Sequence, residues 1–160
     1  MLTLTFKSAK ENGACAEGYQ KFAKFKGGIG KWGKETPFTL LEVLNNNGID
    51  DAIWALRCCE PIQERDRVAR LFACDCAQLI LPLFEKEYLN DNRPRNAIEV
   101  ARKFANGEVS LVELTAASNA AWAAASNAAW AAASDAARDA AWANQEQMLR
   151  KYLMEEKSNA

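Results

Sequence analysis

Residues 119–142 have the sequence NAAWAAASNAAWAAASDAARDAAW, a four-residue unit that mostly alternates tryptophan with serine. Alanine is the strongest helix former, and no glycine or proline occurs after Gly107. Upstream, Ser110 and Glu113 have the spacing of a capping box, which marks the start of a helix. We therefore expect one long helix over residues 110–155, about 65 Å in length if it is straight.

Four residues advance an α-helix by about 400°, so each repeat unit lies about 40° further around the helix axis. Trp122 and Trp142 should then point about 200° apart. Because the large side chains wind around the helix, the pattern favours a central helix whose tryptophans fill gaps between neighbouring helices. The alternative is that Trp130 or Trp142 is exposed and anchors a partner, since interfaces are enriched in tryptophan.

The chain before the repeat predicts a bundle of shorter helices over residues 1–109. The apolar spacing indicates helices over about 14–26, 37–47, 50–59, 60–88 and 93–106. Residues 2–6 alternate as a short strand does, but no partner strand is evident. The expected fold class is all-α: a single domain, residues 1–160, of about six helices, to which a short N-terminal strand can be added.

Local signals predict where several of these helices begin or break. Thr36 and Pro37 suit an N-cap and the first helical position, and Asp50 suits the next N-cap. Pro82 removes a backbone donor inside the long apolar pattern, which predicts a kink or a break there. Before Pro94, Asp91 or Asn92 can cap a helix. The residues expected to face inward in the 50–88 region are Ile53, Trp54, Leu56, Cys59, Val68, Leu71, Phe72, Cys76, Leu79, Ile80, Leu83 and Phe84.

Composition excludes several classes of function. The 20 basic and 21 acidic residues give a net charge of −1, so no basic field attracts duplex nucleic acid or an anionic membrane. Histidine, the commonest general base and metal ligand, is absent. The five cysteines have the spacing of neither a disulfide framework nor a zinc site. We expect a cytoplasmic non-enzyme without a metal or cofactor, with no signal peptide and no transmembrane span.

Two pairs of arginines could bind anions. Arg67 and Arg70 are neighbours on one helix face, and Arg93 and Arg95 flank Pro94. One interpretation is a solvated surface with internal ion pairs, since acidic residues are interleaved with the arginines. The other is a phosphate or carboxylate site, for which the guanidinium fork is well shaped.

Three stretches resemble a known family: RDRVARLFACDCA (65–77), DNRPRNAIE (91–99) and FANGEVS (104–110), the last leading into the alanine-rich helix. Together they are similar to the bacterial and phage proteins of the immunity-protein-5-like family, over roughly residues 50–143. The resemblance implies that the protein neutralises a partner by binding it; phage relatives occur with no adjacent toxin. The most specific part of the resemblance is the DNRPR segment with the helix that follows it. The resemblance carries over only Arg93, Pro94 and Arg95 residue by residue, and closing the turn is one role that it allows for them.

The leading hypothesis is a non-enzymatic inhibitor, encoded by a phage or prophage, that binds a toxin or a host antiviral-defence protein, as anti-CRISPR proteins do. One alternative is a sponge that sequesters a nucleotide second messenger between arginine and tryptophan side chains. Another is a structural protein whose alanine-rich helices associate into a homo-oligomer. The candidate residues for ligand or partner binding are Trp122, Trp130, Trp142, Arg138, Arg93, Arg95, Arg67 and Arg70.

Overall fold

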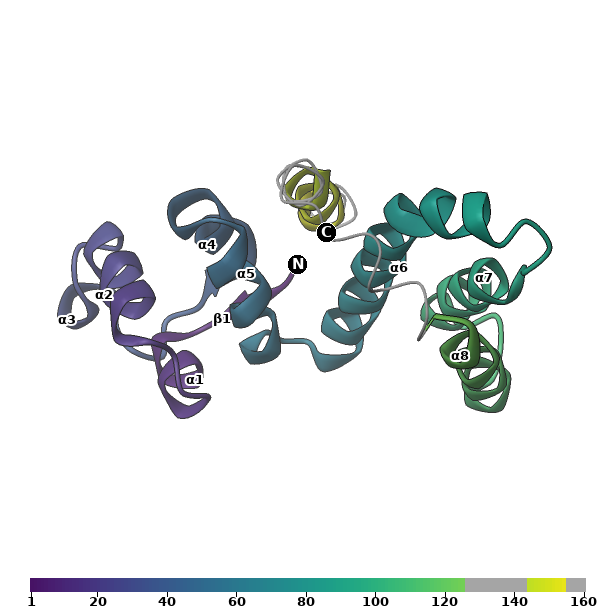
Figure 1. Cartoon of the computed structure of the whole chain (residues 1–160). Coiled ribbons are helices and arrows are strands. Elements are labelled where there is room, and N and C mark those ends of the chain that lie inside the picture. Colours follow the sequence, from purple (N-terminus) through teal and green to yellow (C-terminus); the bar gives the residue numbers. More distant parts are fainter. Residues whose placement is uncertain (126–143, 155–160) are drawn as a thin grey trace. The chain divides into compact units, whose positions relative to one another are not determined.

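The computed structural model describes residues 1–125 and 144–154 of the chain. These residues group into two compact units: a first unit of residues 1–66 with 149–154, and a second unit of residues 67–125 with 144–148. The described residues are mainly helical (Figure 1), which confirms the all-α class. That the whole chain folds as one domain, with residues 1–109 as a bundle and 110–155 as a long helix, stays a prediction.

Short helices and two very short strands make up the first unit. In chain order they are β1 (Thr3–Leu4), α1 (Phe6–Glu11), α2 (Ala16–Phe25), α3 (Ile29–Trp32), β2 (Phe38–Thr39), α4 (Leu40–Asn47), α5 (Ile49–Ala55) and the 3-10 turn η1 (Leu56–Cys58). Helix α6 (Ile62–Glu87) follows and continues into the second unit.

The N-terminal strand pairs with a segment distant in sequence. Antiparallel pairing of β1 with β2 places Leu4 opposite Phe38. On its other side, Thr3 exchanges two backbone hydrogen bonds with Glu60, at 3.1 and 2.8 Å. The expected short strand is therefore confirmed, and its partners are two extended segments that flank α4, α5 and η1.

Two helix starts in the first unit differ from the sequence prediction. Helix α4 begins at Leu40 with Thr39 as its N-cap, not at Pro37. The reason is a capping box: Glu42 N–H donates to Thr39 Oγ1 (3.1 Å), and Thr39 N–H donates to the Glu42 carboxylate (2.8 Å). In α5 the N-cap is Gly48, with φ of 99°, so Asp50 lies in the first turn, where its charge still favours the helix dipole.

The core of the first unit is aromatic and encloses a lysine. Phe6, Phe22 and Phe38 pack with ring centroids 4.6–5.9 Å apart. The Lys26 side chain is only 7% exposed, and its ammonium group lies 3.9 Å from the centroid of the Trp32 ring. That group also donates a 2.5 Å hydrogen bond to Glu42, the capping-box glutamate. Lys26 thus links α2, α3 and the start of α4.

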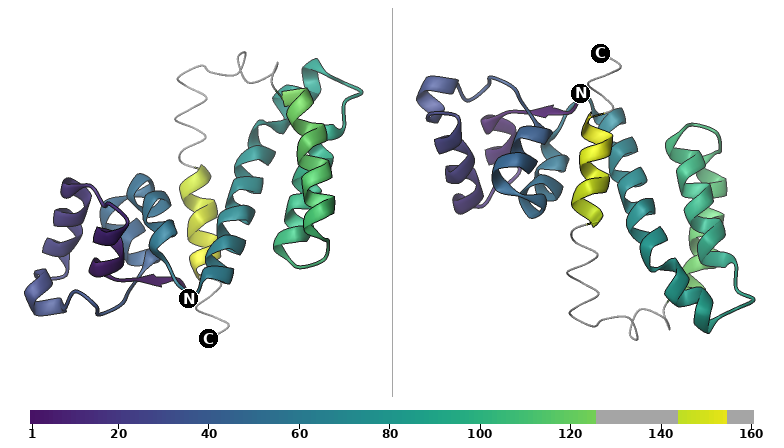
Figure 2. Two further views of the ribbon diagram at one scale, coloured as in Figure 1. Left: turned by 90° about the horizontal axis from the view of Figure 1, so that it is seen from below. Right: turned by 90° about the horizontal axis from the view of Figure 1, so that it is seen from above.

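Three helices make up most of the second unit: the main part of α6, then α7 (Arg93–Ala105) and α8 (Leu111–Ala125). Both views of Figure 2 show α7 and α8 side by side. The buried contact between α6 and α7 is formed by Cys74 and Leu81 of α6 with Ile98 of α7, flanked by Ala77 and Ala101. The predicted starts of α7 and α8 are confirmed, and Ser110 and Glu113 form the expected capping box.

The prediction for α6 is wrong in its C-terminal half. The helix continues through Pro82 without a break, so of the two expectations only a kink stays a prediction. Leu79, Ile80 and Leu83, expected inside, are exposed, whereas Leu81 is buried. The physical reason is that α7 covers the face that contains Cys74 and Leu81, and apolar spacing alone does not show which face a neighbour covers. Ile53 of α5 was likewise expected inside and is exposed.

The described residues 144–154 are helical, as predicted, but residues 126–143 lie outside the described ranges, so the continuity of the 110–155 helix stays a prediction. Leu149 and Leu153 are fully or almost fully buried. Within the first unit, Arg150 donates a hydrogen bond to the Asn45 side chain of α4. Residues 149–154 therefore complete a unit whose other residues are the first 66 of the chain.

Candidate functional site

The connection between α6 and α7 forms an open groove in the second unit, here called the turn groove. It has a volume of about 860 Å³ and is lined by Tyr88, Leu89, Asn90, Asp91, Asn92, Arg93 and Asn96, together with Ala120 of α8. The residues 88–92 lie between the end of α6 at Glu87 and the start of α7 at Arg93. Five of the eight lining residues therefore belong to this short connection, and the other three lie on α7 and α8.

Both arginines predicted at this connection bind carboxylates of the same unit. Arg93 donates two hydrogen bonds to Asp91, at 2.8 and 2.6 Å, and Arg95 donates two to Glu85, at 2.7 and 2.6 Å. The bond from Arg93 lowers the pKa of Asp91 below its ordinary value. Each bidentate pair fixes the arginine side chain and neutralises its charge locally. The Arg95–Glu85 pair also joins α7 to α6.

The apolar part of the turn groove was not predicted from the sequence. Tyr88 stacks on Phe84 with ring centroids 4.7 Å apart, which positions its ring at the end of α6. The next residue, Leu89, is 81% exposed, the most exposed of the large apolar side chains among the described residues. The only sign of this apolar surface in the sequence was a leucine within a connection of asparagine and aspartate residues. Covering an exposed leucine with a partner protein removes apolar surface from water, which favours binding.

The other two arginine candidates lie at the opposite end of the antiparallel pair α6–α7. The Arg70 guanidinium lies 4.7 Å from the centroid of the Phe104 ring. Further along, Arg102 of α7 forms a 2.5 Å ion pair with Asp75 of α6. Arg67 is exposed and also has interaction partners. The structure therefore places Arg93 and Arg95 together in the first turn of α7. Arg67 and Arg70 lie at the other end of the helix pair and do not join them in one site.

Trp122 belongs to α8, but the structure does not describe its side chain. Trp130, Arg138 and Trp142 lie outside the described residues. Their roles as binding residues stay predictions.

Residues 1–125 and 144–154 hold no group of three or more acidic or cysteine side chains that could bind a metal ion. Within the same ranges, none of the helices combines the length and the apolar character that crossing a bilayer requires.

Comparison with known proteins identifies the family. The model of the family described as "Imm-5 like putative immunity protein" matches residues 60–145, more than half of the chain. The chain belongs to this family. The Imm-5 like segment includes every residue that lines the turn groove, and its extent confirms the resemblance seen in the three sequence stretches. No curated protein and no solved structure matches the chain.

Membership of the Imm-5 like family makes this chain an immunity-type protein, a class that acts on a protein partner such as a toxin. The match begins at residue 60, so α1 to α5 of the first unit lie outside it. The turn groove is consequently the best candidate site for the family's function, and the N-terminal residues need a separate explanation.

Proposed function

We propose that this protein is a non-enzymatic inhibitor, encoded by a phage or prophage, that binds and neutralises a toxin or an antiviral-defence protein in the host cytoplasm. The observation that supports it best is the family match over residues 60–145, which contains a pre-formed groove with an exposed Leu89. We propose that the partner covers Leu89 and Tyr88 and that the asparagine side chains of the groove bond to it. The buried core and polar rim would then resemble those of other protein interfaces.

The charges at the turn groove favour a protein partner over a nucleotide. A sponge for a nucleotide second messenger needs guanidinium groups that are available to phosphate. Here Arg93 and Arg95 each hold a carboxylate, so a phosphate would have to displace Asp91 or Glu85. A protein surface can instead add contacts around the neutralised pairs without breaking them.

The test is co-purification of the tagged full-length protein from its native host, with two variants processed in parallel. Leu89→Asp places a charge in the centre of the proposed interface and should weaken binding at least tenfold, because burying a leucine contributes about 1.5–3 kcal/mol. Leu111→Asp is the matched control: Leu111 is also an exposed leucine of the second unit, 63% accessible, but it does not line the groove.

The expected result is one dominant protein recovered with the wild type and with Leu111→Asp but not with Leu89→Asp. Purified wild-type protein should then abolish the activity of that partner at a one-to-one ratio without modifying it covalently. Recovery of no partner, equal loss with both variants, or catalytic turnover of the partner would each overturn the proposal. Release of a bound nucleotide on denaturation would support the sponge instead.

A further inference from the structure

The first unit contains a cavity of about 210 Å³ that lies between α1, α2, α4 and α5. Every residue that lines it falls between Leu4 and Ala55, before the start of the family match at residue 60. Nothing in the proposed inhibitor function uses this cavity. It therefore points to a property of this chain that goes beyond the family's function.

Most of the cavity wall is apolar and aromatic. The rings that line it belong to Phe6, Tyr19, Phe22, Phe38 and Trp54. The Tyr19 hydroxyl donates a hydrogen bond to the Phe6 carbonyl (3.3 Å), so its polar atom has a partner in the protein while its ring faces the cavity. A dry cavity of about 150 Å³ with apolar walls takes up benzene. The present cavity has room for one aromatic ring with a short chain.

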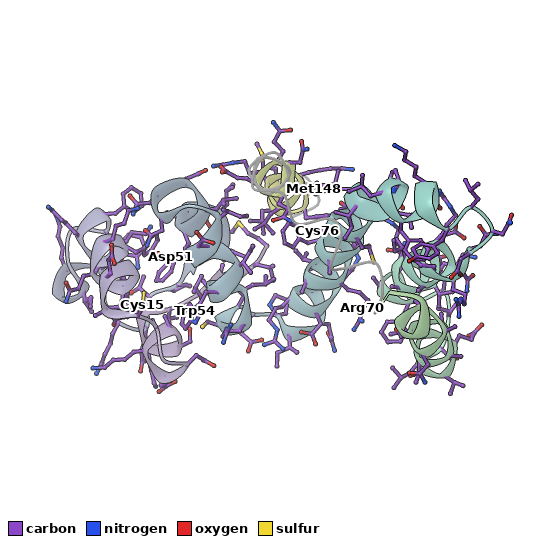
Figure 3. The ribbon with its side chains drawn as sticks, viewed as in Figure 1. Cys15, Asp51, Trp54, Arg70, Cys76 and Met148 are labelled. Atoms are coloured by element: carbon purple, nitrogen blue, oxygen red, sulfur yellow. The ribbon has the colours of Figure 1, made fainter. Side chains whose placement is uncertain are left out.

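One edge of the cavity is polar and acidic. Asn47, Asp50 and Asp51 line it at the junction of α4 and α5, and no lysine or arginine is among the lining residues. Figure 3 shows Asp51 near Cys15 and Trp54, which also line the cavity. The Asp51 carboxylate accepts one hydrogen bond, from the Asn47 amide at 2.6 Å. A carboxylate has room for more than one donor.

The sequence of α2 is adapted to this acidic edge. A Cβ atom on Gly18 would lie 2.5 Å from Asp51 Oδ2, so any other residue at position 18 would push the carboxylate away. The Asn47 amide also donates to the Gly18 carbonyl (2.9 Å), which ties α2 to the end of α4. Two cations contact lining residues but do not themselves line the cavity: Lys21 donates to the Asn47 main-chain carbonyl, and Arg57 lies over the Trp54 ring, 5.3 Å from its centroid.

We propose that this cavity binds a small aromatic amine, with the ring among the aromatic side chains and the ammonium group at Asp51. The size of the cavity fixes the size of the ring system, and the aromatic walls favour an apolar body. The carboxylates, without a compensating basic side chain in the lining, select a positive charge and repel an anion. The aromatic rings add a cation–π attraction for the ammonium group.

The experiment is isothermal titration calorimetry of the full-length protein with 2-phenylethylamine. The matched ligand is 3-phenylpropionate, which has the same ring and a similar chain but carries a negative charge. We expect saturable binding of the amine and binding of the anion at least tenfold weaker, a difference of about 1.4 kcal/mol. Absence of saturable amine binding at millimolar concentrations, or equal affinity for both ligands, would overturn the proposal.

Three variants locate the site. Asp51→Asn keeps the shape of the side chain and should weaken amine binding about tenfold. Glu17→Gln removes one charge from an exposed position of α2 outside the cavity and should leave the affinity unchanged. Ala14→Leu, which adds volume to the lining, should abolish binding of the amine. Equal effects of Asp51→Asn and Glu17→Gln on amine binding, or unchanged binding by a folded Ala14→Leu variant, would contradict the assignment of the site. If a variant does not fold, the comparison of the two ligands on the wild-type protein still decides the charge preference.

Discussion

Replacing Lys26 by methionine is expected to destabilise the first unit, because one ammonium group makes two interactions there. It donates to Glu42 at 2.5 Å and lies over the Trp32 ring at 3.9 Å. A desolvated cation–π contact contributes about 2 kcal/mol, and a hydrogen bond between charged groups about 1.5–3 kcal/mol. Methionine retains the packing of the lysine stem but makes neither interaction.

The net loss is smaller than the sum of these terms. Burial of an ammonium group itself costs several kcal/mol, and that cost disappears in Lys26→Met. Glu42 is 37% exposed, so water can solvate its carboxylate once the lysine is gone. We expect Lys26→Met to lower the free energy of unfolding by about 1–3 kcal/mol. The coupling free energy between Lys26 and Glu42 should be about 1–2 kcal/mol.

A double-mutant cycle measures this coupling directly. Lys26→Met, Glu42→Gln and the double variant are unfolded with urea and followed by circular dichroism; glutamine at position 42 retains the capping-box geometry. The control is the exposed pair Lys7–Glu35, which has the same residue types and a 2.9 Å distance. Its coupling free energy should be clearly smaller than that of Lys26–Glu42, because solvent screens the exposed pair. Equal coupling for the two pairs, or none for Lys26–Glu42, would refute the argument from burial.

Three further predictions follow from local contacts. Thr39→Ala removes the N-cap of α4 and should lower the free energy of unfolding by about 1 kcal/mol in urea titrations. Burial raises the pKa of Glu42, but hydrogen bonds from Lys26 and Thr39 outweigh burial and leave the pKa of the folded state below the ordinary value of 4.5. The ionised Glu42 therefore stabilises the fold above pH 4.5, and this contribution is lost as the pH falls through the pKa of the folded state. Melting temperatures of the wild type and Glu42→Gln, measured as the pH is lowered, should show this loss. Exposed Cys15 should be alkylated first by iodoacetamide, since burial raises the pKa of the Cys58 and Cys74 thiols, as peptide mass spectrometry can establish.

Each of these predictions has a clear contrary result. Thr36→Ala, a change at the predicted but incorrect N-cap, should have little effect, and a loss as large as that of Thr39→Ala would contradict the capping assignment. For the acid dependence, identical melting curves of wild type and Glu42→Gln down to pH 3 would be inconsistent with a lowered pKa. Early labelling of Cys74 would mean that the α6–α7 contact opens readily.

The sequence predicted those structural features that depend on residues close to one another in the chain. The Ser110–Glu113 capping box and the start of α7 at Arg93 each follow from residues within four positions of one another. The resemblance to the family came from three such stretches and did not need the fold. The exposed Leu89 passed unnoticed because composition alone marks its surroundings as a polar turn.

Features that depend on distant residues were missed for a physical reason. Lys26 and Glu42 lie in segments far apart in the sequence. Nothing in either segment indicates that the ammonium group is surrounded by four aromatic rings, those of Phe22, Phe25, Trp32 and Phe38. The cavity of the first unit likewise exists only when four helices, α1, α2, α4 and α5, are in place. On α6, periodicity showed which residues share a face, but only the position of α7 decides that Leu81 is buried and Leu83 exposed.

The burial of Leu149 and Leu153 in the first unit has a consequence during protein synthesis. The 66 N-terminal residues leave the ribosome well before the two leucines that complete their unit are added. At about 5–20 residues per second, roughly 4–18 s of translation separate residue 66 from residue 154. During that interval the nascent chain exposes apolar surface that residues 149–154 later cover, so a ribosome-associated chaperone should bind this chain until those residues have emerged.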